Sequence, residues 1–335
     1  MAEPAITLGF LLFDGFPMAC LTSAIEPLRA ANEIIGRPEF GWKLVGETAA
    51  PIRSSADVRF DPDGPLAQMT GLDSLFLLSA PGARFLDPRG TPARLRWLAR
   101  HGLTLGAFSG GIFPLVRAGV MQGHRASVHW CYEAAFAAEF PAIATSGTVI
   151  TRDRRRLTAA GAGAVFDLML KLIEDRLGAA VMTEVACWFQ HPTIRDEAVR
   201  QKTPVPHTGS TADMLPAAIR QAIRLFADHI EDPIQIADVA CAVALSARHL
   251  ERSFKQATGQ SPLKYYRQMR LKRARQRVLY STDSLTEIAL SIGYASSTPM
   301  VRHYCAEFGL KPAQDRRQHT ALRISGVTVS PAPLI

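Results

Sequence analysis

Short apolar runs alternate with amphipathic stretches over the first 200 residues of the 335-residue chain. Four runs are short, bounded and apolar throughout, as buried strands are, and they cover residues 5–13, 42–47, 74–80 and 103–109. Four other stretches have apolar positions at helical spacing, and they cover residues 23–35, 93–102, 110–121 and 162–178. This alternation predicts an α/β domain with a mainly parallel sheet.

The remainder of the chain has a different pattern. From Met214 to about Thr320 we expect only helices, broken by turn residues. The segment QKTPVPHTGSTAD, residues 201–213, has Pro, Gly, Ser and Thr without apolar periodicity and predicts a linker. The expected organisation is therefore an α/β domain over 1–200, the linker, an all-α domain over 214–320 and a frayed tail over 321–335.

An internal repeat is the most informative feature of the second domain. Residues 236–259 can be laid on residues 285–309, with an offset of 49 in the first helix of each copy and 50 in the second. The extra residue falls in the turn, where Gly293 of the second copy takes the place of Ala244 in the first. Each copy predicts a short helix, a tight turn and a second helix, so the domain is expected to hold two helix-turn-helix units.

Caps and core positions are readable in both copies. Ser246 is the expected N-cap of one second helix, and Ser296 or Ser297 of the other. Leu250 and Phe254 share a buried face at i, i+4, as do Met300 and Tyr304, and Gly259 and Gly309 end the helices. The remaining face is polar and places side chains that bond to base edges in the N-terminal half of each second helix. We expect the DNA-contacting residues to be Ser246, Arg248, Glu251, Arg252, Lys255, Ser297, Thr298, Val301 and Arg302.

Charge supports this interpretation. Residues 1–211 hold 21 Lys and Arg against 20 Asp and Glu, whereas residues 212–320 hold 16 against 10. A basic segment behind a neutral one is typical of a nucleic-acid module attached to another domain. The alternative is a pair of ordinary helical hairpins with solvated faces, which one copy alone would leave open and the repeat disfavours.

A strand-to-helix elbow is predicted in the first domain. The apolar run 103–108 leads into Ser109, Gly110 and Gly111, after which a helix begins, and His129 follows 20 residues later. A small nucleophile on such a turn has backbone N–H groups beside it, and a histidine can act as its base.

Two resemblances extend these expectations. Residues 215–318, with SARHLERSFKQATGQSPLKYYRQMRLKRA and IALSIGYASSTPMVRHYCAEFGLKP, resemble the AraC/XylS-type DNA-binding domain. The resemblance implies seven helices, a long linking helix over about 261–280, and recognition helices near 247–257 and 297–307 in successive major-groove turns. Pro299 departs from the pattern, but proline is tolerated near the first turn of a helix.

Residues 5–200 resemble the PfpI-type, class I glutamine-amidotransferase-like domain of GlxA-like regulators, through residues 25–38, 54–63, 103–130 and 158–178. This resemblance implies a flavodoxin-like sandwich with a Cys nucleophile, a His partner and an acidic residue after the first strand. Here Ser109 takes the Cys position, His129 keeps the His position, and the acidic position falls near Cys20. The expected ligand-binding residues are Ser109, Gly110, Gly111, His129, Glu26 and Asp14.

Three interpretations of the elbow remain open. Ser109 and His129 could form an active hydrolase, although Ala107 breaks the G-x-S-x-G pattern and a serine needs a stronger base than a cysteine. The elbow could instead be a ligand pocket that keeps the anion-binding N–H groups, or a mere structural turn with a satisfied histidine. The sequence favours the pocket, with no catalytic residue.

Other features set limits. No run of eighteen apolar residues occurs, and the N-terminus has no basic flank before its apolar stretch, so we expect a cytoplasmic protein without a membrane contact. Five scattered cysteines without a CxxC pair favour neither a metal site nor disulfides, and we expect no cofactor. The run of Arg152, Arg154, Arg155 and Arg156 favours a solvated hairpin over a contact with DNA phosphates or a partner domain.

The sequence therefore predicts a transcription regulator, most simply an activator, whose partners are promoter DNA, a small-molecule effector, RNA polymerase and a second copy of the chain. The resemblance implies that the effector is a small nitrogenous metabolite such as an amino acid or a quaternary amine. The alternative is a hydrolase or amidase that uses Ser109 and His129 and carries a DNA-binding tail.

Overall fold

The computed structural model describes the backbone of residues 4–191, 194–203 and 214–324, and the side chains of the last helix as far as Gln318. The chain divides after Gln201 into two compact units. Residues 201–203 of the expected linker have no regular secondary structure, and the rest of that segment lies outside the described residues. The expected tail falls partly within the last helix, and residues 325–335 also lie outside the description.

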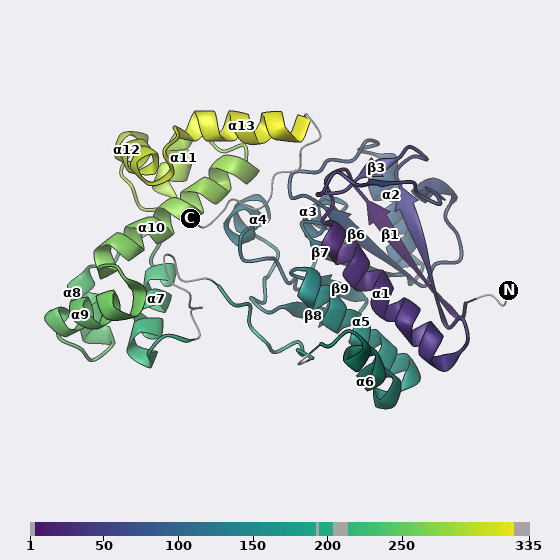
Figure 1. Ribbon diagram of the computed structural model, residues 1–335. Coiled ribbons are helices and arrows are strands. Elements are labelled where there is room, and N and C mark those ends of the chain that lie inside the picture. Colours follow the sequence, from purple (N-terminus) through teal and green to yellow (C-terminus); the bar gives the residue numbers. More distant parts are fainter. Residues whose placement is uncertain (1–3, 192–193, 204–213, 325–335) are drawn as a thin grey trace. The chain divides into compact units, whose positions relative to one another are not determined.

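The first unit is built on one seven-stranded sheet in the order β5-β2-β1-β6-β7-β9-β8 (Figure 1). All neighbouring strands are parallel except β8 and β9, which form an antiparallel hairpin. The strands are β1 (Ile6–Leu12), β2 (Phe40–Gly46), β5 (Gly64–Pro65), β6 (Ser74–Ser79), β7 (Thr104–Ser109), β8 (Ile150–Asp153) and β9 (Arg156–Ala159), and a separate pair is formed by β3 (Ile52–Arg53) and β4 (Arg59–Phe60).

This strand order confirms the predicted fold class. The five central parallel strands follow the doubly wound order 2-1-3-4-5 that is typical of flavodoxin-like sheets. All four apolar runs form strands, namely β1, β2, β6 and β7. They are apolar because each lies between two neighbouring strands and buries side chains on both faces of the sheet.

Helices cover the sheet. The apolar faces of α1 (Met18–Ile35), α5 (Ala162–Leu177) and α6 (Ala179–Trp188) share one core cluster with Phe10, Phe76 and Phe108 of the sheet. Figure 1 shows α1, α5 and α6 gathered beside one another. The remaining helices of this unit are the 3-10 turn η1 (Leu66–Gln68), α2 (Gly90–Arg100), α3 (Ile112–Arg117) and α4 (Glu133–Glu139).

The second unit contains seven helices among its described residues, the number that the resemblance implies. They are α7 (Ala217–Asp228), α8 (Ile236–Ala242), α9 (Ala247–Thr258), α10 (Pro262–Tyr280), α11 (Leu285–Leu290), α12 (Ser297–Phe308) and α13 (Pro312–Ile324). Two apolar cores lie along α10, one containing Tyr265 and Tyr266 and the other Leu271, Ala274 and Val278. The long helix therefore belongs to both helix-turn-helix units.

Candidate functional site

The first helix-turn-helix unit consists of α8 and α9. Ser246 caps α9, and its side chain accepts a hydrogen bond from the backbone N–H of His249 at 3.2 Å. Leu250 and Phe254 are fully buried against α7 and α8, as the i, i+4 spacing predicts. Gly259 ends the helix in the left-handed region with φ +74°.

The second unit consists of α11 and α12. The side chain of Ser284 and that of Glu287 form a reciprocal capping box at the start of α11. Ser296, one of the two expected residues, is the N-cap of α12, although its side chain makes no capping bond. Pro299 is the third residue of α12, in the first turn, where a backbone N–H has no helical partner to lose.

The outward faces of α9 and α12 carry the residues that the sequence singled out. Most are exposed, and they are Ser246, Arg248, Glu251, Arg252, Lys255, Thr298 and Arg302. Among the described residues, no ion pair involves Arg248, Arg252 or Arg302, so these guanidinium groups keep their donors for a partner. Ser297 and Val301 are only half exposed, and Val301 packs against the second core. Its methyl groups thus contribute to packing, and their contact with DNA stays a prediction.

Arg270 of α10 is a positioning residue that the sequence reading missed. Its guanidinium donates to the carbonyl oxygens of Ile292 and Gly293, both at 2.7 Å, and lies 4.6 Å from the ring centroid of Tyr294. These contacts hold the turn between α11 and α12. The partners are backbone atoms more than twenty residues away, and no local pattern marks such partners.

A buried acid fixes the start of α13. Asp315 accepts hydrogen bonds from the Arg275 guanidinium at 2.8 Å and from the Tyr304 hydroxyl at 2.7 Å. Tyr304 is fully buried on α12, and its pKa is raised by burial and by the neighbouring carboxylate. Helix α12 is therefore joined to both α10 and α13.

The elbow of the first unit has the geometry that the sequence predicts. Ser109 ends β7 with φ +53°, a left-handed conformation that is uncommon for a residue other than glycine. Gly110 and Gly111 follow because side chains do not fit: a Cβ on Gly111 would lie 1.9 Å from the Leu77 carbonyl oxygen, and one on Gly110 would lie 2.4 Å from that of Ser79. The turn thus presses directly against β6.

The imidazole of His129 has contacts at Nδ1 that favour one tautomer. Its Nδ1 accepts a hydrogen bond from the backbone N–H of Cys131 at 3.3 Å and lies 2.8 Å from the Cys131 sulfur. Because a backbone N–H only donates, Nδ1 carries the lone pair, and the proton of the neutral ring is on Nε2. Burial lowers the pKa of His129 to about 4, so the ring is neutral at neutral pH.

The elbow and His129 lie at the same edge of the sheet. Ser109 stands at the carboxyl end of β7, and its neighbour β9 ends at Ala159 in parallel register, just before Gly161. A Cβ on Gly161 would be 3.3 Å from Cδ2 of His129. Within the described residues no hydrogen bond joins Ser109 to His129.

The two expected carboxylates are engaged elsewhere. Asp14 accepts a hydrogen bond from the backbone N–H of Arg53 at 3.0 Å, and Glu26 forms an ion pair with Arg29 at 3.0 Å on α1. Cys20, at the acidic position of the resemblance, is buried, and burial raises the pKa of its thiol to about 12. No contact found in the described part of the chain joins either carboxylate to Ser109 or His129.

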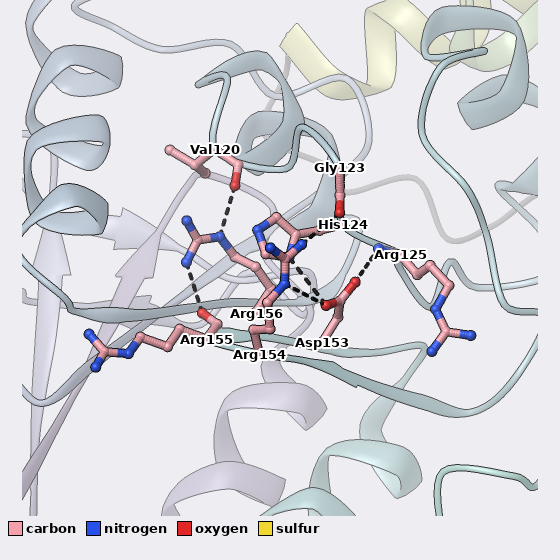
Figure 2. Close-up of polar contacts among 8 residues, drawn as sticks. All are labelled: Val120, Gly123, His124, Arg125, Asp153, Arg154, Arg155 and Arg156. Atoms are coloured by element: carbon pink, nitrogen blue, oxygen red, sulfur yellow. Dashed lines mark hydrogen bonds and ion pairs between the residues drawn. The ribbon is translucent and has the colours of Figure 1, made fainter.

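The arginine run forms the β8–β9 hairpin, as the simpler interpretation predicts. Figure 2 shows Arg154 and Arg156 bonded to the loop 120–125: Arg154 donates to the Gly123 carbonyl oxygen at 2.7 Å and Arg156 to that of Val120 at 2.8 Å. Asp153 accepts from the backbone N–H of Arg125, and this bond, with Arg154, lowers the pKa of Asp153 to about 2. These contacts account for a structural role of the run.

In the described residues, no group of three or more His, Cys, Asp or Glu side chains could hold a metal ion. None of the helices in the same residues is both long enough and apolar enough to cross a membrane.

Comparison with known proteins agrees with the two-unit organisation. A family model described as a helix-turn-helix domain matches residues 239–318. The chain is 32% identical over 311 residues to the regulator GbdR of Pseudomonas aeruginosa, covering 93% of this chain and 84% of that protein. It is 33% identical to the regulator ArgR of the same species, covering 93% of each, and 27% identical to the regulator GlxA of Rhizobium meliloti, covering 93% and 95%.

Among solved structures, an AraC family transcriptional regulator from Pseudomonas putida is similar with a TM-score of 0.49 and 26% identity, covering 55% of this chain and 99% of that one. A ThiJ/PfpI family protein from Pseudomonas syringae has a TM-score of 0.49 and 19% identity, covering 73% and 91%. Similarity to GbdR and ArgR over 93% of the chain, together with two helix-turn-helix units that follow a doubly wound sheet in the sequence, identifies the chain as a member of the AraC-family DNA-binding transcriptional regulators with an α/β N-terminal domain.

Proposed function

We propose that the N-terminal unit binds a small nitrogenous metabolite at the elbow without converting it, and that this binding controls an activator of transcription. The activator acts as a homodimer on promoter DNA and contacts RNA polymerase. A ligand acts in this way only if it binds one state of the protein better than the other. The curated relatives that match the full chain carry names of regulators, and this supports a non-enzymatic role.

One observation carries the non-enzymatic part of the proposal. A general base for Ser109 needs a free lone pair directed at the hydroxyl, and a carboxylate usually holds the other ring nitrogen as the donor. In His129 the Cys131 N–H donates to Nδ1, which favours the reverse tautomer with the proton on Nε2. The ring therefore offers a hydrogen-bond donor to a ligand and no base to a nucleophile.

The test uses Ser109→Ala and His129→Gln in the full-length protein. A thermal-shift screen with the free L-amino acids and quaternary amines identifies compounds that raise the wild-type Tm, and a reporter assay measures their effect on transcription. We expect both variants to weaken the response to the active compound. Neither the wild type nor a variant should hydrolyse amide or ester substrates. Hydrolysis by the wild type that disappears in Ser109→Ala would refute the proposal.

The expected sites on DNA are part of the same proposal. The exposed guanidinium groups of Arg252 and Arg302, which form no ion pair with any described residue, lie on α9 and α12, one in each helix-turn-helix unit. In helix-turn-helix proteins this part of the second helix meets base edges in the major groove. Their contribution is tested by the substitutions described in the Discussion.

A further inference from the structure

The chain leaves the first unit along the β8 edge of the sheet. Val199 accepts a hydrogen bond through its carbonyl oxygen from the Val149 N–H at 2.9 Å, and Arg200 forms an antiparallel bridge with Thr148. The Gln201 N–H then donates to the Gly147 carbonyl oxygen at 3.2 Å. Residues 199–201 thus pair with residues 147–149 around an isolated β-bridge, and the division into two units falls directly after Gln201.

The side chain of Gln201 reaches beyond these paired residues to the segment that carries His129. Its Oε1 accepts from the Trp130 N–H at 2.9 Å, and its Nε2 donates to the Val128 carbonyl oxygen at 2.7 Å. The same Nε2 donates to the Thr148 carbonyl oxygen at 3.1 Å. One primary amide therefore holds the two peptide groups on either side of His129, and only a group that both donates and accepts can do so.

His129 itself has little freedom to move apart from its backbone. Its ring is bonded to the peptide N–H of Cys131 and packs against Gly161, where even a Cβ would lie 3.3 Å from the ring. A ligand that displaces the ring must therefore shift the backbone of residues 128–131. That backbone is what Gln201 holds.

We propose that Gln201 is a positioning residue that couples the His129 segment to the point where the chain leaves the first unit. A displacement at the elbow changes the bonds of the Gln201 amide and so changes how firmly residues 199–201 are held to the sheet. The inference rests on the proposed function, because the displacement is assigned to effector binding at the elbow. It connects effector binding to the chain segment that continues into the DNA-binding unit.

The first test needs no effector. Trypsin cleavage after Lys202 in the full-length protein reports local opening of the paired residues 199–201, and cleavage after Arg100, at the end of α2, reports opening of the unit elsewhere. Gln201→Met keeps the length of the side chain and removes its hydrogen bonds. We expect about tenfold faster cleavage after Lys202, with cleavage after Arg100 unchanged. Gln122→Met, at an exposed glutamine of the same unit, is the matched control and should change neither rate.

A double-mutant cycle separates coupling from simple loosening. His129→Ala alone is expected to speed cleavage after Lys202 about threefold, because the segment loses its packing on Gly161. If Gln201 transmits this effect, the double variant cleaves no faster than Gln201→Met. If the two effects multiply instead, the double variant is cleaved after Lys202 about thirtyfold faster than the wild type, and this result would overturn the proposal. If Gln201→Met also speeds cleavage after Arg100, the variant Gln201→Glu is used in its place. A glutamate keeps the acceptor for the Trp130 N–H but has no N–H to donate to Val128 and Thr148. An unchanged rate of cleavage after Lys202 in Gln201→Glu would overturn the proposal.

The second test uses any free L-amino acid or glycine betaine that raises the wild-type Tm. Such a compound should change the wild-type rate of cleavage after Lys202 at least threefold. In Gln201→Met it should still raise the Tm but leave that rate unchanged, which a purely structural role for Gln201 does not predict. The same change in both proteins would overturn the coupling. If no compound in the panel binds, the proposed effector class fails, while the effector-free cycle still decides the role of Gln201.

Discussion

Ala244 and Gly293 occupy the same place in the two helix-turn-helix units, and both have left-handed backbones, with φ +56° and +72°. The two positions differ in their surroundings. A Cβ on Gly293 would lie 2.4 Å from Cγ of Pro233 and 2.9 Å from the Glu231 carbonyl oxygen, whereas Ala244 is exposed. The repeat therefore preserves the conformation of the turn, and only the second copy also requires the absence of a side chain.

This relationship predicts opposite outcomes for exchanging the residues. Ala244→Gly should stabilise the second unit by roughly 0.5–1 kcal/mol, because the left-handed conformation costs glycine nothing and costs alanine about 1 kcal/mol or more, less the added entropy of the unfolded chain. Gly293→Ala should destabilise it by more than about 2 kcal/mol, since strain and overlap add. Urea denaturation followed by circular dichroism measures both. Effects of equal size and opposite sign would show that the overlap with Pro233 and Glu231 adds nothing to the cost at Gly293.

Substitutions on the reading helices should weaken DNA binding. Arg252→Ala and Arg302→Ala are each expected to cost about 1–3 kcal/mol of binding free energy and to relax specificity at one base position. Arg224→Ala on α7 removes the same charge from another exposed position of the unit and serves as the control. Competition binding against a library of operator variants gives the affinity at each base. A uniform loss over all sequences would assign these residues to phosphates alone.

His129 should make the first unit sensitive to acid. Its pKa is about 4 in the folded protein and near 6.5 when unfolded, because burial disfavours the charged ring. A histidine with a lowered pKa in the folded protein binds its proton preferentially in the unfolded state. Its contribution to the free energy of unfolding is therefore fully present above pH 6.5 and is lost as the pH falls towards 4. The loss at pH 5 is about 2 kcal/mol. Comparing urea midpoints at pH 7 and pH 5 for the wild type and His129→Gln isolates this contribution, and an identical pH dependence would contradict it.

Asp315 should be the most sensitive polar residue of the second unit. It is buried, and its removal leaves the Arg275 guanidinium and the Tyr304 hydroxyl without their acceptor. Breaking a buried charge pair from one side costs about 3–5 kcal/mol. Asp315→Ala should therefore lower the urea midpoint much more than Asp283→Ala, whose ion pair with Arg277 is more exposed. Similar losses for both variants would show that burial does not distinguish the two pairs.

Much of the second unit could be predicted because its information is local. Caps such as Ser246 and buried pairs such as Leu250 and Phe254 lie within four residues of their partners, and a repeat shows each of them twice. The contacts of Arg270 and Asp315 could not be predicted, because their partners lie on other helices or on the backbone. Half burial of Val301 has the same cause, since the width of a helix face depends on its neighbours.

The first unit likewise has some features that local sequence predicts and others that it does not. An apolar run followed by Ser109 and two glycines suffices to predict a left-handed elbow, since only that turn needs such small residues. Two-residue strands such as β3 and β4 carry too little pattern to be recognised. The engagement of Glu26 and Asp14 elsewhere, and the tautomer of His129, depend on atoms brought together by folding.

The shared helix α10 also constrains the operator. A helix of 19 residues is about 28 Å long, comparable to the roughly 34 Å between successive major grooves on one face of DNA. Since both cores include α10, the two reading helices cannot adjust their separation independently of it. We expect the DNA to bend to meet this fixed spacing, so that sequence steps between the two contacted segments affect affinity although no side chain touches them. We expect a single base pair inserted there to move one half-site around the duplex, while the shared helix α10 keeps the two helix-turn-helix units at their original spacing.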